Sequence, residues 1–208
     1  GNILVTVVSA SEGYPSASHK YGPSSARVNA RIWRSGPPLK TGSACVCRRR
    51  WISHDRCPEE PRAASIFSLP ALKAAVDNGA DAVYLGFKND TNARNFAGLN
   101  FDDKTLHEGI RYAQSRGRKV LLAINTYAQP GRVEAWRKAV DGAADLGVDA
   151  VIMADVGLLA YARDRHPDLR LHLSVQGSAT NYEAVNFCQR EFGIKRAVLP
   201  RVLTLAQV

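Results

Sequence analysis

The stretch SLPALKAAVDNGADAVYLG, residues 68–86, holds one complete unit of the pattern that fills the second part of the chain. Ser68 is a suitable helix N-cap, and Pro70 falls in the first helical turn, where a missing N–H is tolerated. Apolar residues at helical spacing then lead to Gly79, a typical helix stop, and the apolar run 82–86 is typical of a buried strand. The unit therefore predicts one helix followed by one strand.

Similar units recur along the rest of the chain. Further helices are predicted over about 102–116, 131–146 and 156–165, and a fifth starts at a capping box formed by Thr180 and Glu183. In the fifth helix, the side chains expected to face the core are Tyr182, Val185, Cys188 and Phe192. The apolar runs that follow these helices are 120–124, 150–154, 171–175 and 197–199.

These apolar runs are near-continuous, which is typical of parallel strands covered on both faces. Five strands alternating with five helices predict an α/β fold, and both a (β/α)8 barrel and a doubly wound sheet fit. No G-x-G-x-x-G fingerprint supports the doubly wound sheet. A full barrel typically needs about 250 residues, and residues 204–208 predict the start of another helix. We therefore expect a partial TIM-barrel-like (β/α) repeat of five to six parallel strands.

The first part of the chain differs in composition. Residues 1–65 hold ten of the 28 Lys and Arg residues, only four of the 19 Asp and Glu residues, and six of the ten prolines. They show no sustained period, although the apolar run 3–8 could add a strand to a sheet. We interpret residues 1–65 as an irregular or disordered basic Ser/Pro/Arg-rich extension, non-native in origin, to a domain over 66–208. The only methionine is Met153, so the chain is expected to be processed, truncated or a fragment.

Two functional interpretations of this extension are weaker than a structural or accidental one. Cys45, Cys47 and Cys57, with His54 nearby, do not have the ligand spacing of a standard zinc site. The basic run 48–50 beside a tryptophan could contact phosphate, but a single run is weak evidence. Nucleic acid is therefore not an expected partner of the extension.

Several classes of protein are not supported. No apolar run approaches the roughly 20 residues that span a bilayer, and no export signal is visible, so we expect a cytoplasmic protein without a membrane span. The motifs G-x-S-x-G and H-E-x-x-H and a P-loop are also missing from the sequence.

The candidate site lies at the carboxyl ends of the strands, where the loops of an α/β fold share one open face. Its members are mostly amides and hydroxyls, which can orient a polar molecule or nucleotide but include no nucleophile with a base. They are Asn92, Arg94, Asn125, Thr126, Asp155, Gln176, Ser178, Asn181 and Arg201. Asp155 could be a general base or a helix cap. His172 and Cys188 are interpreted as packed core residues.

A family resemblance adds to this interpretation. Residues 69–86 resemble the opening of the collagenase-like peptidase family of unclassified mechanism, family U32, and further similarity lies at 123–127, 174–181 and 198–202. The stretch Asp90–Phe101, DTNARNFAGLNF, resembles the UbiU-type branch, which acts in oxygen-independent ubiquinone biosynthesis. The resemblance covers about residues 68–208 and does not extend to residues 1–65.

This resemblance implies a TIM-barrel-like domain, a four-iron four-sulfur cluster held by four cysteines, and a heterodimer with a UbiV-type sister protein. It also implies a role in hydroxylating a ubiquinone precursor without dioxygen. Other branches of the family are implicated in RNA base hydroxylation, and the family name records proteolysis.

The sequence departs from the family pattern in two ways. The residues 64–67 stand where the family has a Cys-Pro-Ala-Gly strand, which leaves the first strand in question. The family's cluster cysteines lie beyond Val208, so we expect no cluster in this chain and no activity of the chain alone.

Overall fold

The computed structural model describes residues 62–200 and 202–203, together with the backbone of three strands nearer the N-terminus. These strands are β1 (Leu4–Ser9), β2 (Asn29–Arg34) and β3 (Cys45–Val46). Arg201 and the cysteine and histidine side chains considered as a zinc cluster lie outside the described residues.

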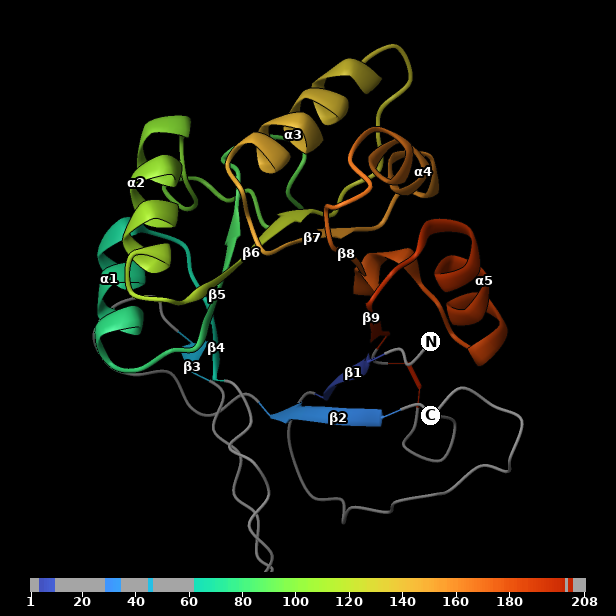
Figure 1. Cartoon of the computed structure of the whole chain (residues 1–208), viewed down its shortest axis with the longest axis horizontal. Helices are drawn as coiled ribbons and strands as arrows, with labels where there is room; N and C mark the ends of the chain where they lie inside the picture. Colours follow the sequence, from blue (N-terminus) through green and yellow to red (C-terminus); the bar gives the residue numbers. More distant parts are fainter. Residues whose placement is uncertain (1–3, 10–28, 35–44, 47–61, 201, 204–208) are drawn as a thin grey trace, which may run out of the picture.

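Six parallel strands form the centre of the fold, side by side in chain order. They are β4 (Ala63–Ser65), β5 (Ala82–Gly86), β6 (Lys119–Ile124), β7 (Ala150–Met153), β8 (Leu171–Leu173) and β9 (Arg196–Leu199). In Figure 1 they follow one curved arc, which makes the sheet a half-barrel. The predicted α/β class and partial barrel are confirmed, and β4 supplies the first strand that the sequence left in question.

The five α-helices of the described residues lie on the outer side of this arc (Figure 1). They are α1 (Leu69–Asp77), α2 (Asp103–Gln114), α3 (Val133–Asp145), α4 (Val156–Arg165) and α5 (Tyr182–Phe192), and a short 3-10 helix, η1 (Val175–Gly177), follows β8. The core fills the layer between helices and sheet, where Leu72, Leu106, Val140 and Leu159 are fully buried. The predicted glycine stops are confirmed at both ends of the repeat, since φ is +85° at Gly79 and +67° at Gly193.

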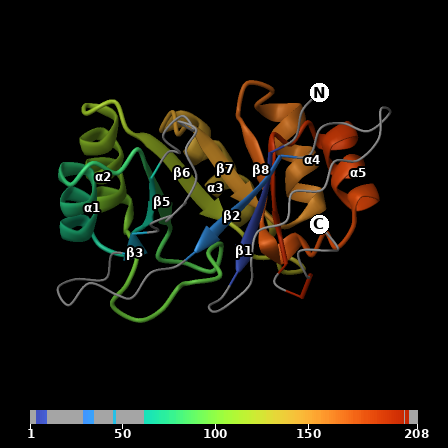
Figure 2. The ribbon, with the colours of Figure 1, turned by 90° about the horizontal axis from the view of Figure 1, so that it is seen from below.

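The three strands nearer the N-terminus extend both edges of the half-barrel. β1 pairs in parallel with β9 and β2 pairs with β1, whereas β3 pairs antiparallel with β4. Figure 2 shows β1 and β2 running next to each other alongside the half-barrel. β2 forms in a stretch where the sequence shows no period.

The start of α5 differs from the prediction. Its N-cap is Asn181, whose side-chain oxygen accepts a hydrogen bond from the Ala184 N–H at 2.9 Å, so Thr180 is not the cap. The helix consequently starts one residue later, and Tyr182, in its first turn, is 67% exposed. The expected inward position of Tyr182 is wrong, whereas Val185, Cys188 and Phe192 are buried as predicted.

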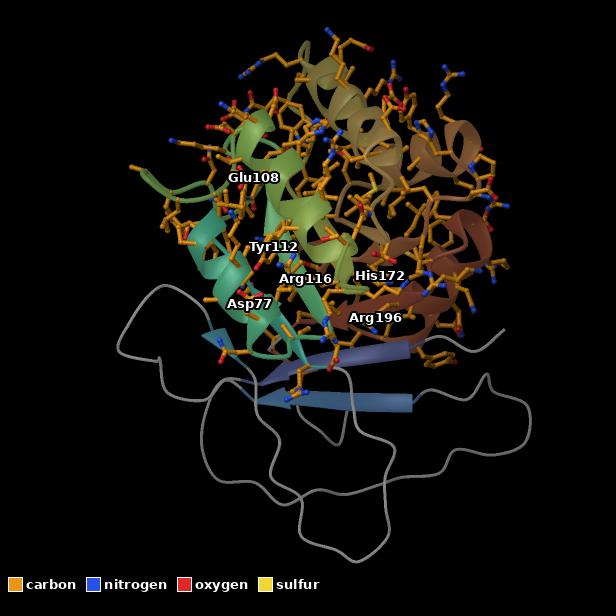
Figure 3. All side chains as sticks on the ribbon, turned by 60° about the vertical axis from the view of Figure 1, so that its left-hand side comes forward. Asp77, Glu108, Tyr112, Arg116, His172 and Arg196 are labelled. Atoms are coloured by element: carbon orange, nitrogen blue, oxygen red, sulfur yellow. The ribbon has the colours of Figure 1, made fainter. Side chains whose placement is uncertain are left out.

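Polar contacts between neighbouring helices hold the outer layer together. The Tyr112 hydroxyl lies 2.8 and 2.9 Å from the two carboxylate oxygens of Asp77, and the Arg116 guanidinium stacks 3.5 Å from the centre of the Tyr112 ring (Figure 3). The Asp141 carboxylate accepts a hydrogen bond from Tyr161 and lies 2.6 Å from His166 Nε2. These groups therefore join α1 to α2 and α3 to α4, and they lie outside the barrel.

Candidate functional site

The loops after β5 and β6 are fastened to each other by predicted site residues. The Asn125 side-chain oxygen accepts a hydrogen bond from the Ala93 N–H at 2.9 Å, and the Asn125 N–H donates to the Thr91 carbonyl. The Thr126 hydroxyl donates to the Asp90 carbonyl at 2.6 Å and accepts from the indole N–H of Trp136 at 3.0 Å. These contacts brace the two loops through Asn125 and Thr126.

Asp155, at the end of β7, joins two segments through its carboxylate. One oxygen accepts hydrogen bonds from the Gly157 and Leu158 N–H groups at 2.8 and 3.1 Å, which caps α4. The other oxygen accepts from the Ala128 N–H at 3.0 Å. Both oxygens are therefore engaged by backbone donors, and this geometry supports the capping role of Asp155 over that of a general base.

The segment after β8 is anchored from the loop after β6. The Tyr127 hydroxyl donates a hydrogen bond to the Gln176 carbonyl at 2.7 Å. Ser178 ends η1 in the left-handed conformation, with φ +50°, and its hydroxyl lies 3.4 Å from the same carbonyl. The side chains of Gln176 and Ser178 are exposed at this edge of the half-barrel, whereas Asn181 is used as the cap of α5.

The loop after β5 is built around the backbone of Arg94. The Asn92 side chain, only 5% exposed, donates to the Phe87 carbonyl at 3.0 Å and accepts from the Arg94 N–H at 3.1 Å. The Asn100 amide donates to the Arg94 carbonyl at 2.6 Å, and Asn100 itself has φ +72°. Asparagine tolerates this left-handed conformation better than most residues. Two asparagine side chains thus fix Arg94 from both sides.

A small cavity of about 10 Å³ lies under this loop, at the carboxyl ends of β4 and β5. Its polar lining comprises Ser65, Tyr84, Asn92, Arg94 and Asn100. The Arg94 guanidinium donates to the Ser65 hydroxyl at 3.2 Å. Burial raises the pKa of Tyr84 to about 12, although the charge of Arg94 opposes this shift, so the phenol stays protonated at neutral pH.

Arg94 has three neighbours that were not among the predicted site residues, namely Ser65, Tyr84 and Asn100. Tyr84 lies between Val83 and Leu85, which are 0% and 1% exposed. Because side chains alternate along a strand, this spacing places Tyr84 on the inner face of the sheet. An alternation signal was thus present in the sequence, but the long apolar run concealed it.

The same edge carries exposed apolar side chains. Of the six large hydrophobic residues exposed in the described part of the chain, five follow the carboxyl ends of the strands. They are Phe96, Tyr127, Val156, Tyr182 and Val202. The three aromatic rings among them are 56–67% exposed and belong to the segments after β5, β6 and β8.

The two predicted core residues with reactive side chains are packed. His172 in β8 is 5% exposed, and burial, assisted by the charges of Arg196 and Arg170, lowers its pKa to about 3. Figure 3 shows His172 beside Arg196, its register partner in β9. Burial raises the pKa of the Cys188 thiol, as expected of an inert core cysteine.

The described residues do not fit an iron–sulfur cluster. Such a cluster takes four cysteine thiolates, and Cys188 is the one cysteine whose side chain is described. Within residues 62–200 and 202–203 no three His, Cys, Asp or Glu side chains are grouped to hold a metal ion. None of the described helices has the length and apolarity needed to cross a membrane.

Comparison with known proteins places these features in a family. The model of peptidase family U32 matches residues 67–208. An uncharacterized protease of Methanocaldococcus jannaschii is 40% identical over 140 residues, which make up 67% of this chain and 33% of the relative. The tRNA hydroxylation protein P of Escherichia coli is 32% identical over 142 residues, 68% of this chain and 30% of the relative. The chain spans about a third of the length of these relatives.

A solved structure supports the fold. The structure of a U32 peptidase superposes with a TM-score of 0.55 at 18% identity, covering 72% of this chain and 62% of that one. At this identity the likeness concerns the fold, and the family assignment depends on the sequence match over 67–208. The chain belongs to peptidase family U32.

Proposed function

We propose that this chain is the substrate-orienting half-barrel of a UbiU-type protein, which supports hydroxylation of a ubiquinone precursor without dioxygen. The observation that carries the proposal is the stretch Asp90–Phe101, whose sequence resembles that branch and which forms the loop over the cavity at the carboxyl ends of β4 and β5. In barrels of this kind the loops at the carboxyl ends of the strands bind substrate.

The loop is suited to substrate binding because it is held in one conformation. Hydrogen bonds with the side chains of Asn92, Asn100 and Asn125 fix its backbone, so little conformational entropy would be lost when a ligand binds. Phe96 and Tyr127 expose aromatic rings at this edge that can stack on a planar substrate ring.

We further propose that the intact protein carries a four-iron four-sulfur cluster and pairs with a UbiV-type sister protein in the cytoplasm. The cluster would supply electron transfer in the intact protein. Its cysteine ligands would lie outside the described residues, so the part assigned to this half-barrel is to bind and orient the substrate.

RNA hydroxylation is the second candidate function. The name of the Escherichia coli relative, which matches 68% of this chain, supports it. Exposed aromatic residues such as Phe96, Tyr127 and Tyr182 are also typical of proteins that stack unpaired bases. Proteolysis has less support, because no described serine, threonine or cysteine is hydrogen-bonded to a histidine.

Deletion of the parent gene would separate the two hydroxylation functions. The deletion strain would be grown with and without dioxygen, and its ubiquinone and the hydroxylated nucleosides of its tRNA would be measured by mass spectrometry. Loss of ubiquinone only in anoxic cells, with tRNA nucleosides unchanged, would support the UbiU-type function. The converse result would support RNA hydroxylation, and unchanged levels of both products would refute both proposals.

Anaerobic iron–sulfur reconstitution of the intact parent protein tests the cofactor separately. We expect the visible absorbance of a four-iron four-sulfur cluster. A colourless reconstituted protein would contradict the cofactor proposal.

A further inference from the structure

Among the residues that the structure describes, Arg94 is a cation held in place without an anionic partner. Its N–H and its carbonyl are both bound by asparagine side chains, at 3.1 Å from Asn92 and 2.6 Å from Asn100. The position of Asn92 in turn depends on Gly86, because a Cβ at Gly86 would overlap the Asn92 amide. Several residues thus fix the backbone position of one exposed arginine.

The contrast with Arg132 shows that a paired arginine is possible at the same edge. Arg132 lies 3.2 Å from the Asp90 carboxylate and 2.9 Å from the Gln129 side-chain oxygen. The guanidinium of Arg94 reaches only the neutral Ser65 hydroxyl, and none of the described carboxylates lies within ion-pair distance of it. Its positive charge is therefore uncompensated by the described residues.

The surroundings of the Arg94 guanidinium supply further donors. The Ser65 hydroxyl and the Tyr84 phenol line the same cavity, whose volume of about 10 Å³ suffices for roughly one water molecule. The phenol is protonated at neutral pH and can donate a hydrogen bond. A guanidinium that extends from a fixed backbone beside two hydroxyl groups is a donor set that suits a negatively charged oxygen.

We propose that Arg94, with Ser65 and Tyr84, binds an anionic oxygen of the substrate at the mouth of the half-barrel. This inference rests on the proposed function, in which substrate enters at the carboxyl ends of the strands. The oxygen could belong to the phenolate or carboxylate of an aromatic ring or to a phosphate, and the chemistry of recognition is the same for both sources. In this role Arg94 binds the substrate directly and orients it relative to the exposed aromatic side chains.

The test is equilibrium binding to the full 208-residue chain with three probes: a hydroxybenzoate, inorganic phosphate and a short single-stranded oligoribonucleotide. We expect Arg94→Gln to lower the affinity for the probe that binds by about tenfold or more, the usual effect of losing hydrogen bonds from a charged group. Arg94→Lys should retain part of the affinity, because it keeps the charge but loses the planar fork. The matched control Arg132→Gln should stay within about twofold of wild type, because Arg132 is already paired.

Thermal unfolding of each variant checks that the chain is still folded, and the probes identify the source of the oxygen. Arg94-dependent binding of hydroxybenzoate alone indicates a ring substituent, and Arg94-dependent binding of phosphate and oligoribonucleotide indicates a phosphate. The proposal is overturned if no probe shows Arg94-dependent binding, or if Arg132→Gln lowers affinity as much as Arg94→Gln. These binding results do not depend on hydroxylation, so failure of the gene-deletion experiment would be distinguishable from failure here.

Discussion

Substitution of Gly86 by alanine tests whether the loop after β5 depends on close contact with its strand. A Cβ on Gly86 would overlap the Asn92 Nδ2 atom and lie 2.6 Å from its Cγ, so Asn92 would have to move. Asn92 is 5% exposed, and its side chain makes one hydrogen bond to the Phe87 carbonyl and one from the Arg94 N–H. Its movement would break both bonds and displace Arg94.

The expected loss of stability follows from these contacts. Two hydrogen bonds contribute about 1 kcal/mol each, and overpacking of a buried site costs about 1–3 kcal/mol. Part of this loss, roughly 0.5–1 kcal/mol, is offset because alanine restricts the unfolded chain more than glycine does. We therefore expect Gly86→Ala to lower the free energy of unfolding by about 2–4 kcal/mol.

Urea unfolding of the full chain, with an unchanged slope against denaturant, measures this difference. The matched control is Gly142→Ala in α3, where a Cβ would meet no atom within 4 Å. Helix propensity predicts a gain of about 0.5–1 kcal/mol for this control. In an Asn92→Ala background, which removes the overlapping amide, Gly86→Ala should cost much less than in the wild type. An equal cost in both backgrounds would refute the proposed clash.

Three further predictions concern a cap, a loop brace and a buried histidine. Asn181→Ala should lower the free energy of unfolding by about 1 kcal/mol through loss of the α5 cap, whereas Thr180→Ala should have little effect. If urea unfolding showed the larger loss of stability for Thr180→Ala, Thr180 would be the cap. Asp155→Asn should cost about 1–2 kcal/mol, because an amide offers one acceptor oxygen where the carboxylate uses two; a stability equal to that of wild type would show that one of these bonds contributes nothing. For His172 the pKa in the folded state is about 3, below the usual 6.5, so the unfolded chain binds the proton first as the pH falls. The free energy of unfolding should therefore fall below pH 6.5, towards pH 3, by at most about 1.4 kcal/mol per pH unit. Urea unfolding at pH 7.5 and 5 should show that His172→Gln loses this pH dependence. An equal change in stability between the two pH values in wild type and variant would contradict the lowered pKa.

The repeat of helices and strands was predictable because its signals are local. Helical spacing, the cap at Ser68 and the stop at Gly79 each concern residues within a few positions of one another, and each is found in the structure. The start of α5 was less predictable, because Thr180 and Asn181 are adjacent and both are good N-caps. The backbone geometry, with the Asn181 oxygen aimed at the Ala184 N–H, decides between them.

The site was predictable as a location and much less as a set of roles. The rule that parallel strands point their carboxyl ends to one edge selected Asn92, Arg94 and Asn125. Their partners come from other segments, since Asn125 accepts from the Ala93 N–H and Arg94 reaches Ser65, 29 residues earlier in the chain. Such contacts depend on the packing of loops and have no periodic signature in the sequence.

Hydrogen-bond partners separate the structural from the ligand-binding groups at this edge. Asn92 and Asn125 are buried polar groups that must be satisfied, and Asp155 caps a helix. All three accept backbone N–H groups, so the fold alone explains them. The fold does not explain in the same way the fixed backbone of Arg94, or a charge that none of the described carboxylates compensates, because an exposed arginine needs neither to remain solvated. A rigid frame that ends in one oriented cation reduces the cost of ordering a bound ligand. Asn92 and Asn100 therefore act on the substrate indirectly, because they fix the backbone position of Arg94, the residue proposed to bind it.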